Sequence, residues 1–156
     1  MTFERWLVLQ KLYNDYASSL DDGPLSDWPD FFTEKCLYLI QPRDNYDAGL
    51  PMAVVRCESR GMLQDRVNAV QETIMFEPRY LRHLITNIEA DDASSDEFQV
   101  RANYSVIEVL NDDLPRILSA GRYLDRVVLE NGLLRFKEKR VIYDSVLVPN
   151  SLIYPL

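Results

Sequence analysis

The spacing of the apolar residues changes near Pro78, and this change constrains the fold more than any other feature of the chain. Before Pro78, apolar residues recur at the spacing of one helix face. After it, apolar and polar residues alternate, most clearly from Phe98 to Val106, as in a half-buried strand. Asn131-Gly132 lies between two apolar runs, and both residues tolerate the positive φ of a type I′ hairpin turn. We therefore predict an α+β domain, with helices first and a long antiparallel meander after them.

Three helices are predicted in the first half of the chain. The first covers residues 3–20 and ends at an Asp-Asp-Gly-Pro sequence. The second is short, residues 26–32, and has Pro29 in its first turn, where a missing N–H is tolerated. The third covers residues 60–76 and is capped by Ser59. The predicted inward positions are Phe3, Trp6, Leu9, Tyr13, Tyr16 and Leu20 in the first helix, and Met62, Leu63, Val67, Val70 and Ile74 in the third.

The remaining segments are predicted as strands and loops. The strands are expected at residues 36–40, 52–57, 80–90, 98–106, 116–130 and 133–144, and the loops at 41–51, 91–96 and 111–113. Gly121 lies inside a strand and suggests a bulge where the sheet bends. With the helices on one face of a curved antiparallel or mixed sheet, residues 1–156 form one cone-shaped domain with a possible pocket.

Charge and cysteine usage narrow the class of partner. The formal net charge is −8 and there is no basic stripe, which disfavours nucleic acid. Cys36 and Cys57 are too few for a disulfide framework or a four-cysteine zinc site, and two reduced thiols suit a cytosol. The first 20 residues carry charges that a secretory signal would lack, and the longest apolar run, residues 36–40, is too short for a membrane span. We expect a cytoplasmic protein with no membrane or nucleic-acid partner.

His83 is the only histidine in the chain, and this count limits the chemistry. A mononuclear iron site of the two-histidine, one-carboxylate kind needs two histidines, and a Rieske cluster needs two histidines and two cysteines. A three-histidine zinc site is excluded in the same way. We therefore expect no metal ligands of these kinds in this chain, and no phosphate loop or nucleotide fingerprint points to a bound cofactor.

Two other readings stay open at the level of sequence. His83, paired with a carboxylate in a cone pocket, could serve as an acid or base in a free-standing dehydratase or isomerase; otherwise it hydrogen-bonds within the fold or across an interface. Tyrosines on the predicted strands could line a pocket for a small molecule, although core or interface packing is the commoner role of such residues. These tyrosines are Tyr38, Tyr80, Tyr104, Tyr123 and Tyr143.

Two motifs resemble the small β subunits of aromatic-ring-hydroxylating oxygenases. One is Trp28–Phe32, a Trp-Pro-Asp-Phe-Phe sequence followed by a strand. The other is Arg82-His83-Leu84 with Asn87 four residues after the histidine. The Arg-His pair is weak by itself and gains weight from the rest of the chain.

A loop and the chain's ending are more specific. The loop Gln41–Tyr46, followed by Gly49-Leu50-Pro51, is similar to that of salicylate 5-hydroxylase small subunits. Tyr143-Asp144-Ser145 and Pro149–Leu156 are more similar still to the ending of those subunits, and terephthalate dioxygenase small subunits are a near second match. The resemblance spans the whole chain.

The resemblance implies a fold, a partner and a set of cofactors. The fold is a nuclear-transport-factor-2-like (cystatin-like) cone, shared with scytalone dehydratase and ketosteroid isomerase. The partner is a large α subunit, usually in an α3β3 hexamer, which holds a Rieske [2Fe-2S] cluster and a mononuclear Fe(II). Electrons come from NADH through a reductase, often with a ferredoxin. The β subunit is a structural subunit with no catalytic residue, and the substrate is an aromatic acid, salicylate-like or terephthalate-like.

The structural and interface candidates lie on one strand and at the chain's ending. They are Arg82, His83, Asn87, Tyr143, Asp144, Ile153 and Tyr154. Asp144 is expected to pair with an arginine or to cap the tail. The tail, residues 146–156, carries several apolar side chains that are unfavourable in water, so we expect it to be docked.

Overall fold

The computed structural model describes residues 2–72, 78–145, 147, 152 and 154–156. Within them the elements are, in chain order, α1 (Phe3–Asp22), the 3-10 helix η1 (Leu25–Phe31), β1 (Phe32–Pro42), α2 (Arg43–Asp47), β2 (Val55–Cys57), α3 (Arg60–Glu72), β3 (Arg79–Asp92), β4 (Glu97–Leu110), β5 (Arg116–Glu130) and β6 (Leu133–Tyr143). The strands β3 to β6 follow the last helix, as the change of spacing at Pro78 predicts, whereas the 11-residue strand β1 precedes α2 and α3.

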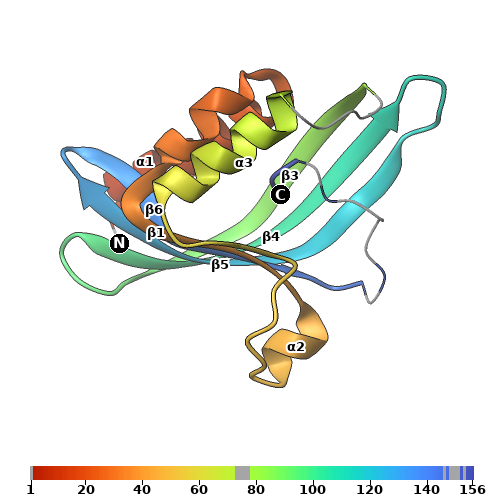
Figure 1. The fold of residues 1–156 in the computed structure, drawn as a ribbon. Helices are drawn as coiled ribbons and strands as arrows, with labels where there is room; N and C mark the ends of the chain where they lie inside the picture. The colour runs from red at the N-terminus through yellow and green to blue at the C-terminus, as the bar shows by residue number, and fades with distance from the viewer. Residues whose placement is uncertain (1, 73–77, 146, 148–151, 153) are drawn as a thin grey trace.

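The six strands form one curved sheet in the order β2-β1-β6-β5-β4-β3. β1 runs parallel to β6, and every other pairing is antiparallel, so the sheet is mixed. Figure 1 shows the sheet curving around α1 and α3, with α2 on the opposite side. We call the space between the sheet and these two helices the cone interior. The predicted α+β architecture is confirmed.

Helix α1 forms where its apolar spacing predicts and runs to Asp22. The Thr2 side chain caps it by accepting the N–H of Arg5 at 3.3 Å, and the Gly23 N–H donates to the Ser19 carbonyl at 3.1 Å. Its buried residues are Leu9, Leu12, Tyr13, Tyr16 and Leu20. The inward placement of Phe3 is wrong, because its side chain is 74% exposed where α1 begins.

The other two predicted helices are also present. The short helix is the 3-10 turn η1, and it buries Trp28 and Pro29. α3 is capped by Ser59, whose Oγ accepts the Met62 N–H at 3.2 Å. Leu63, Val67 and Val70 are buried as predicted. Met62 is exposed, so its inward placement is wrong, and Ile74 lies outside the described residues.

The region after β1 differs most from the prediction. The strand predicted at 36–40 is longer, Phe32–Pro42, and the loop predicted at 41–51 contains the short helix α2. A one-turn helix rich in polar residues has too few apolar positions to show a helical spacing. The strand predicted at 52–57 shortens to Val55–Cys57.

The β5–β6 hairpin turns at Asn131-Gly132 with φ values of 53° and 79°, which confirms the predicted turn. The bulge predicted at Gly121 is wrong, because pairing is continuous there. β5 is irregular near Leu118, where the pairing shifts between Val106 and Ile107 of β4. Gly121 instead allows β5 and β6 to approach each other closely, because a Cβ there would lie 2.0 Å from the Ile142 carbonyl oxygen of β6.

Aromatic side chains dominate the core between α1, η1 and the sheet. Tyr16 packs edge-on against Phe136 with ring centroids 5.4 Å apart, and Trp28 packs against Tyr38 at 5.1 Å. These rings are fully or almost fully buried. Buried aromatic residues contribute much of the apolar area of a domain core, so this cluster fixes α1 and η1 on the sheet.

Candidate functional site

Most of the strand tyrosines point into the cone interior. Tyr38, Tyr104, Tyr123 and Tyr143 are buried, whereas Tyr80 is 72% exposed on the outer side of the sheet. Tyr104 stacks on Tyr123 with centroids 4.6 Å apart, and its hydroxyl lies 2.9 Å from Ser119 Oγ. Burial raises the pKa of the Tyr38, Tyr104 and Tyr123 hydroxyls, so these groups stay protonated.

A buried ion pair occupies the same interior. Lys139 and Asp125 face each other across β6 and β5, with Lys139 Nζ 2.9 Å from Asp125 Oδ2 and both side chains inaccessible to water. Tyr13 Oη donates to the same carboxylate oxygen at 2.5 Å. The ammonium group also lies 3.4 Å from the centroid of the Tyr123 ring and 4.7 Å from that of Tyr16. The cation is therefore held by one carboxylate and several ring faces.

Burial and pairing act in opposite directions on this pair. Burial raises the pKa of Asp125, and the nearby Lys139 ammonium opposes that rise. Burial lowers the pKa of Lys139, and Asp125 opposes that fall. Such a pair is sensitive to the loss of either partner, because the remaining charge has no water around it.

His83 is fully engaged by its own chain. Its backbone N–H donates to both carboxylate oxygens of Asp21 at 3.0 Å, and its Nδ1 lies 2.6 Å from Asp21 Oδ1. Its Nε2 lies 3.3 Å from the carbonyl oxygen of Pro155, and the side chain has no exposed surface. Neither ring nitrogen is free to exchange a proton with a substrate in this arrangement.

Arg82 and Asn87 lie near His83 on β3, which is an edge strand of the sheet formed by the described residues. Arg82 donates to Asp22 and to the carbonyl oxygen of Leu81, both at 2.9 Å. Asn87 has a φ of 51° where the β3–β4 register shifts. Side chains that cap edge groups and bulges that bend an edge are common ways to prevent strand addition. The Asp21 carboxylate on the His83 N–H and the irregularity at Asn87 are two such features at the edge of β3.

Tyr143 and Asp144 end β6 in different environments. Tyr143 is buried and pairs with Gly121 and Pro42 on either side. Asp144 is half-exposed and pairs with Arg43 at 3.2 Å, which confirms the arginine partner expected for it. Its N–H donates to the Ala120 carbonyl at 2.9 Å.

The described end of the tail is docked as expected. Pro155 and Leu156 are buried, Tyr154 is partly buried, and Ile153 lies outside the described residues. Leu156 donates its N–H to Tyr38 Oη at 3.0 Å, and its carbonyl oxygen accepts from Tyr16 Oη at 3.0 Å.

The outer side of the sheet carries exposed apolar side chains at one end. Tyr80 and Leu84 lie on β3, and Ile117 lies on β5 in register with Ile107 of β4. Ile117 is 70% exposed, and Leu114 in the β4–β5 turn is also exposed. We call Tyr80, Leu84, Leu114 and Ile117 the outer apolar patch.

Metal and membrane sites were sought among the described residues. There, no group of three or more His, Cys, Asp or Glu side chains could hold a metal ion. No described helix is both long and apolar enough to cross a membrane.

Three residues of the interior ion pairs, Asp21, Asp125 and Lys139, cannot be singled out from the sequence. Asp21 looked like part of a helix-ending turn, yet its carboxylate holds His83. Asp125 and Lys139 become partners because β6 carries an extra residue, which shifts the register between Arg126 and Val127.

Comparison with known proteins gives consistent matches. The family model described as "Ring hydroxylating beta subunit" matches residues 16–150. The small subunit of anthranilate 1,2-dioxygenase from Burkholderia cepacia is 35% identical over 97% of this chain and 94% of that protein. A β subunit of the terminal oxygenase component of terephthalate 1,2-dioxygenase from Comamonas is 29% identical over 90% of this chain and 92% of that protein.

A solved structure agrees with these relatives. It is a protein from Novosphingobium aromaticivorans, assigned as the β subunit of an aromatic-ring-hydroxylating dioxygenase. It is 36% identical, covers 96% of this chain and 95% of that one, and superposes with a TM-score of 0.87. The cone-shaped fold that the sequence resemblance implies is confirmed.

Proposed function

Because this chain belongs to the family of ring-hydroxylating dioxygenase β subunits, we propose that it is a structural subunit that supports a larger catalytic α subunit. The observation that carries this proposal is the closed cone interior. His83 has both ring nitrogens engaged, and Pro155 and Leu156 are buried beside it. A reacting group needs room and a free proton donor or acceptor, and the interior offers neither near His83.

The partner subunit would supply the iron chemistry. With one histidine in the sequence, this chain lacks the ligands for a Rieske [2Fe-2S] cluster or a two-histidine iron site. We assign both groups to the α subunit, with electrons delivered from NADH through a reductase or ferredoxin. An α3β3 assembly is the stoichiometry that we expect.

The substrate would be an aromatic acid. Similarity to anthranilate and terephthalate dioxygenase subunits supports this class. The sequence motifs point the same way, toward salicylate-like or terephthalate-like rings. The choice among these rings would be made in the large subunit.

The outer apolar patch is the surface that we assign to the partner. It lies on both sides of Arg82 in β3, which is where the sequence motif places an anchor. Apolar side chains clustered on a sheet face are typical of an interface that is buried on assembly. His83 and Tyr143 are buried inside the fold, so they would support this surface from within.

A free-standing dehydratase or isomerase is the competing function. It requires His83 to exchange a proton with a ligand, but Asp21 and Pro155 occupy the two ring nitrogens. If the isolated chain did catalyse such a reaction, His83→Ala would abolish it. We expect the isolated chain to have no turnover to lose.

Co-expression with a large α subunit of a ring-hydroxylating dioxygenase from the same organism tests the proposal. We expect the two chains to co-purify, and ring hydroxylation to need both. A large subunit expressed alone is the control. If it hydroxylates normally alone and does not retain this chain on purification, the supporting role is wrong.

A further inference from the structure

Leu152, Pro155 and Leu156 are held by side chains from several elements of the fold. Side chains from α3, β3, α1 and β1 bind main-chain atoms of the tail. Arg66 donates to the Leu152 carbonyl at 2.8 Å, and His83 Nε2 lies 3.3 Å from the Pro155 carbonyl oxygen. Tyr38 Oη both accepts the Leu156 N–H at 3.0 Å and donates to the Leu156 carbonyl oxygen at 3.4 Å.

These contacts form a built site. Tyr16 and Tyr38 have no exposed surface, and both hydroxyls reach the Leu156 carbonyl oxygen. Trp28 Nε1 donates to Tyr16 Oη at 3.3 Å, which leaves the Tyr16 hydrogen directed at the tail. The Leu156 side chain is buried in the core cluster. Main-chain hydrogen bonds together with a buried apolar side chain are how peptide segments are recognised.

The cone interior also contains a hydroxyl group whose hydrogen bond is not made. The Tyr123 hydroxyl is buried and has no hydrogen-bond partner within the described part of the chain. Burial and the neighbouring hydroxyls of Tyr16, Tyr104 and Tyr38 raise its pKa, so the Tyr123 hydroxyl belongs to the same cluster of buried tyrosines. An unpaired buried hydroxyl is unfavourable, so the interior contains a polar group that the tail leaves unsatisfied.

We propose that the cone interior is a peptide-binding site whose resident ligand is the chain's own Pro155-Leu156 segment. The ligand class is a Pro-Leu peptide segment, bound through its main-chain atoms and a buried aliphatic side chain. While Pro155 and Leu156 occupy the site, it is closed to other ligands. This inference does not depend on the assembly role, since it concerns the inside of the fold.

The test is to delete Pro155 and Leu156 and titrate the shortened chain with N-acetyl-prolyl-leucine by calorimetry. We expect one peptide to bind per shortened chain and no heat with the full chain, whose site is filled. N-acetyl-prolyl-aspartate is the matched control and should not bind, because a carboxylate side chain would be buried without a partner. A shortened chain that folds but binds neither peptide overturns the proposal.

Two substitutions in the shortened chain show whether binding uses the assigned atoms. Tyr38→Phe removes both of its hydrogen bonds to leucine, those made with Leu156 in the full chain, and should weaken binding about 5- to 30-fold. Tyr104→Phe removes a buried hydroxyl that bonds Ser119 and should change binding by less than about 2-fold. Equal effects of the two substitutions would contradict the assigned site.

The shortened chain could also fail to fold without its own tail. In that case refolding is carried out with millimolar N-acetyl-prolyl-leucine, and we expect the peptide to restore the native circular dichroism spectrum. N-acetyl-prolyl-aspartate should not restore it. Failure of both peptides to restore the fold would count against the proposal as firmly as an absence of heat.

Discussion

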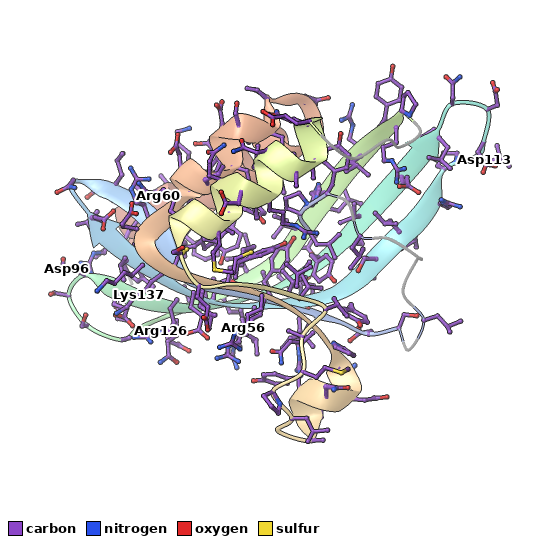
Figure 2. All side chains as sticks on the ribbon, viewed as in Figure 1. Arg56, Arg60, Asp96, Asp113, Arg126 and Lys137 are labelled. Carbon is purple, nitrogen blue, oxygen red and sulfur yellow. The ribbon has the colours of Figure 1, made fainter. Side chains whose placement is uncertain are left out.

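The inner and outer faces of the same sheet carry different residues in different environments. Inside, Lys139 and Asp125 form a buried pair surrounded by aromatic rings, and Leu156 is buried in the same core. Outside, Arg126 pairs with Glu97 at 2.5 Å and Lys137 with Glu97 at 3.4 Å, on a surface open to water. Figure 2 shows Arg126 and Lys137 on the side of the sheet away from α1 and α3.

The outer face is itself divided. Its charged half lies toward the β5–β6 hairpin and Asp96, and the outer apolar patch lies toward the opposite end of the sheet, near Asp113 (Figure 2). An interior filled by its own chain leaves little room for catalysis, whereas an exposed apolar patch is unfavourable until a partner covers it. The contrast suggests that this cone contributes through its surface.

The largest effect is expected from Lys139→Met, which leaves Asp125 as a buried charge with no cation. Removing one partner of a buried ion pair typically costs about 3–5 kcal/mol, so we expect a loss of that size in the free energy of unfolding. Urea unfolding of the purified chain measures it.

The matched control is Lys137→Met, two residues along the same strand on the exposed side. Its ion pair with Glu97 is accessible to water, so the change should stay within roughly 0.5 kcal/mol. The double change Lys139→Met with Asp125→Leu should recover most of the loss. If Lys139→Met and Lys137→Met have the same effect, the inner and outer faces do not differ as described.

Gly121→Ala should have the next largest effect. Its Cβ would lie 2.0 Å from the Ile142 carbonyl oxygen, so β5 and β6 would have to separate. We expect a loss of about 1–3 kcal/mol, as for other overpacked sites. Gly61→Ala is the control, because its Cβ meets only Ser59 Oγ at 3.7 Å and alanine favours the helix. Thermal unfolding should lower the midpoint for the first variant and leave or raise it for the second.

The smallest effect concerns pH and Cys36. Burial raises the pKa of this thiol from 9.0 to about 11. Above its ordinary pKa the unfolded chain loses the thiol proton before the folded chain does. The contribution of Cys36 is therefore complete below about pH 9 and is lost as the pH rises toward 11.

Urea unfolding at about pH 8 and about pH 10 should therefore show a steeper alkaline loss for the natural chain than for Cys36→Ala. The tyrosines are common to both chains, so the difference reports the thiol. Equal pH dependence in the two chains would show that Cys36 is not protected by burial.

The sequence predicts more of the fold than of the interior site. The spacing of apolar residues predicted α1, α3 and the long strands. It could do so because buried and exposed positions alternate with apolar and polar residues, as at Phe98, Val100 and Ala102. Helix α2 escaped prediction because one polar turn has no recognisable period.

The Lys139–Asp125 ion pair could not be predicted from the sequence, for a geometric reason. A two-residue turn at Asn131-Gly132 sets a register that would place Asp125 opposite Glu138. One extra residue in β6 instead brings Asp125 opposite Lys139, and only the structure shows that extra residue. His83 could be picked out from the sequence as a singular residue, but its partners Asp21 and Pro155 lie far away along the chain.

If this subunit acts through its outer face, assembly with the large subunit must depend on the outer apolar patch. Tyr80→Ser with Ile117→Ser removes two exposed members of the outer apolar patch, and Tyr123→Phe removes an interior hydroxyl without a partner among the described residues. We predict that the outer double variant loses at least about tenfold in the amount of complex that co-purifies. The Tyr123→Phe complex should assemble and hydroxylate its aromatic substrate at the natural rate. Normal assembly of the outer variant, or a Tyr123→Phe complex that assembles fully but has lost turnover, would contradict this account.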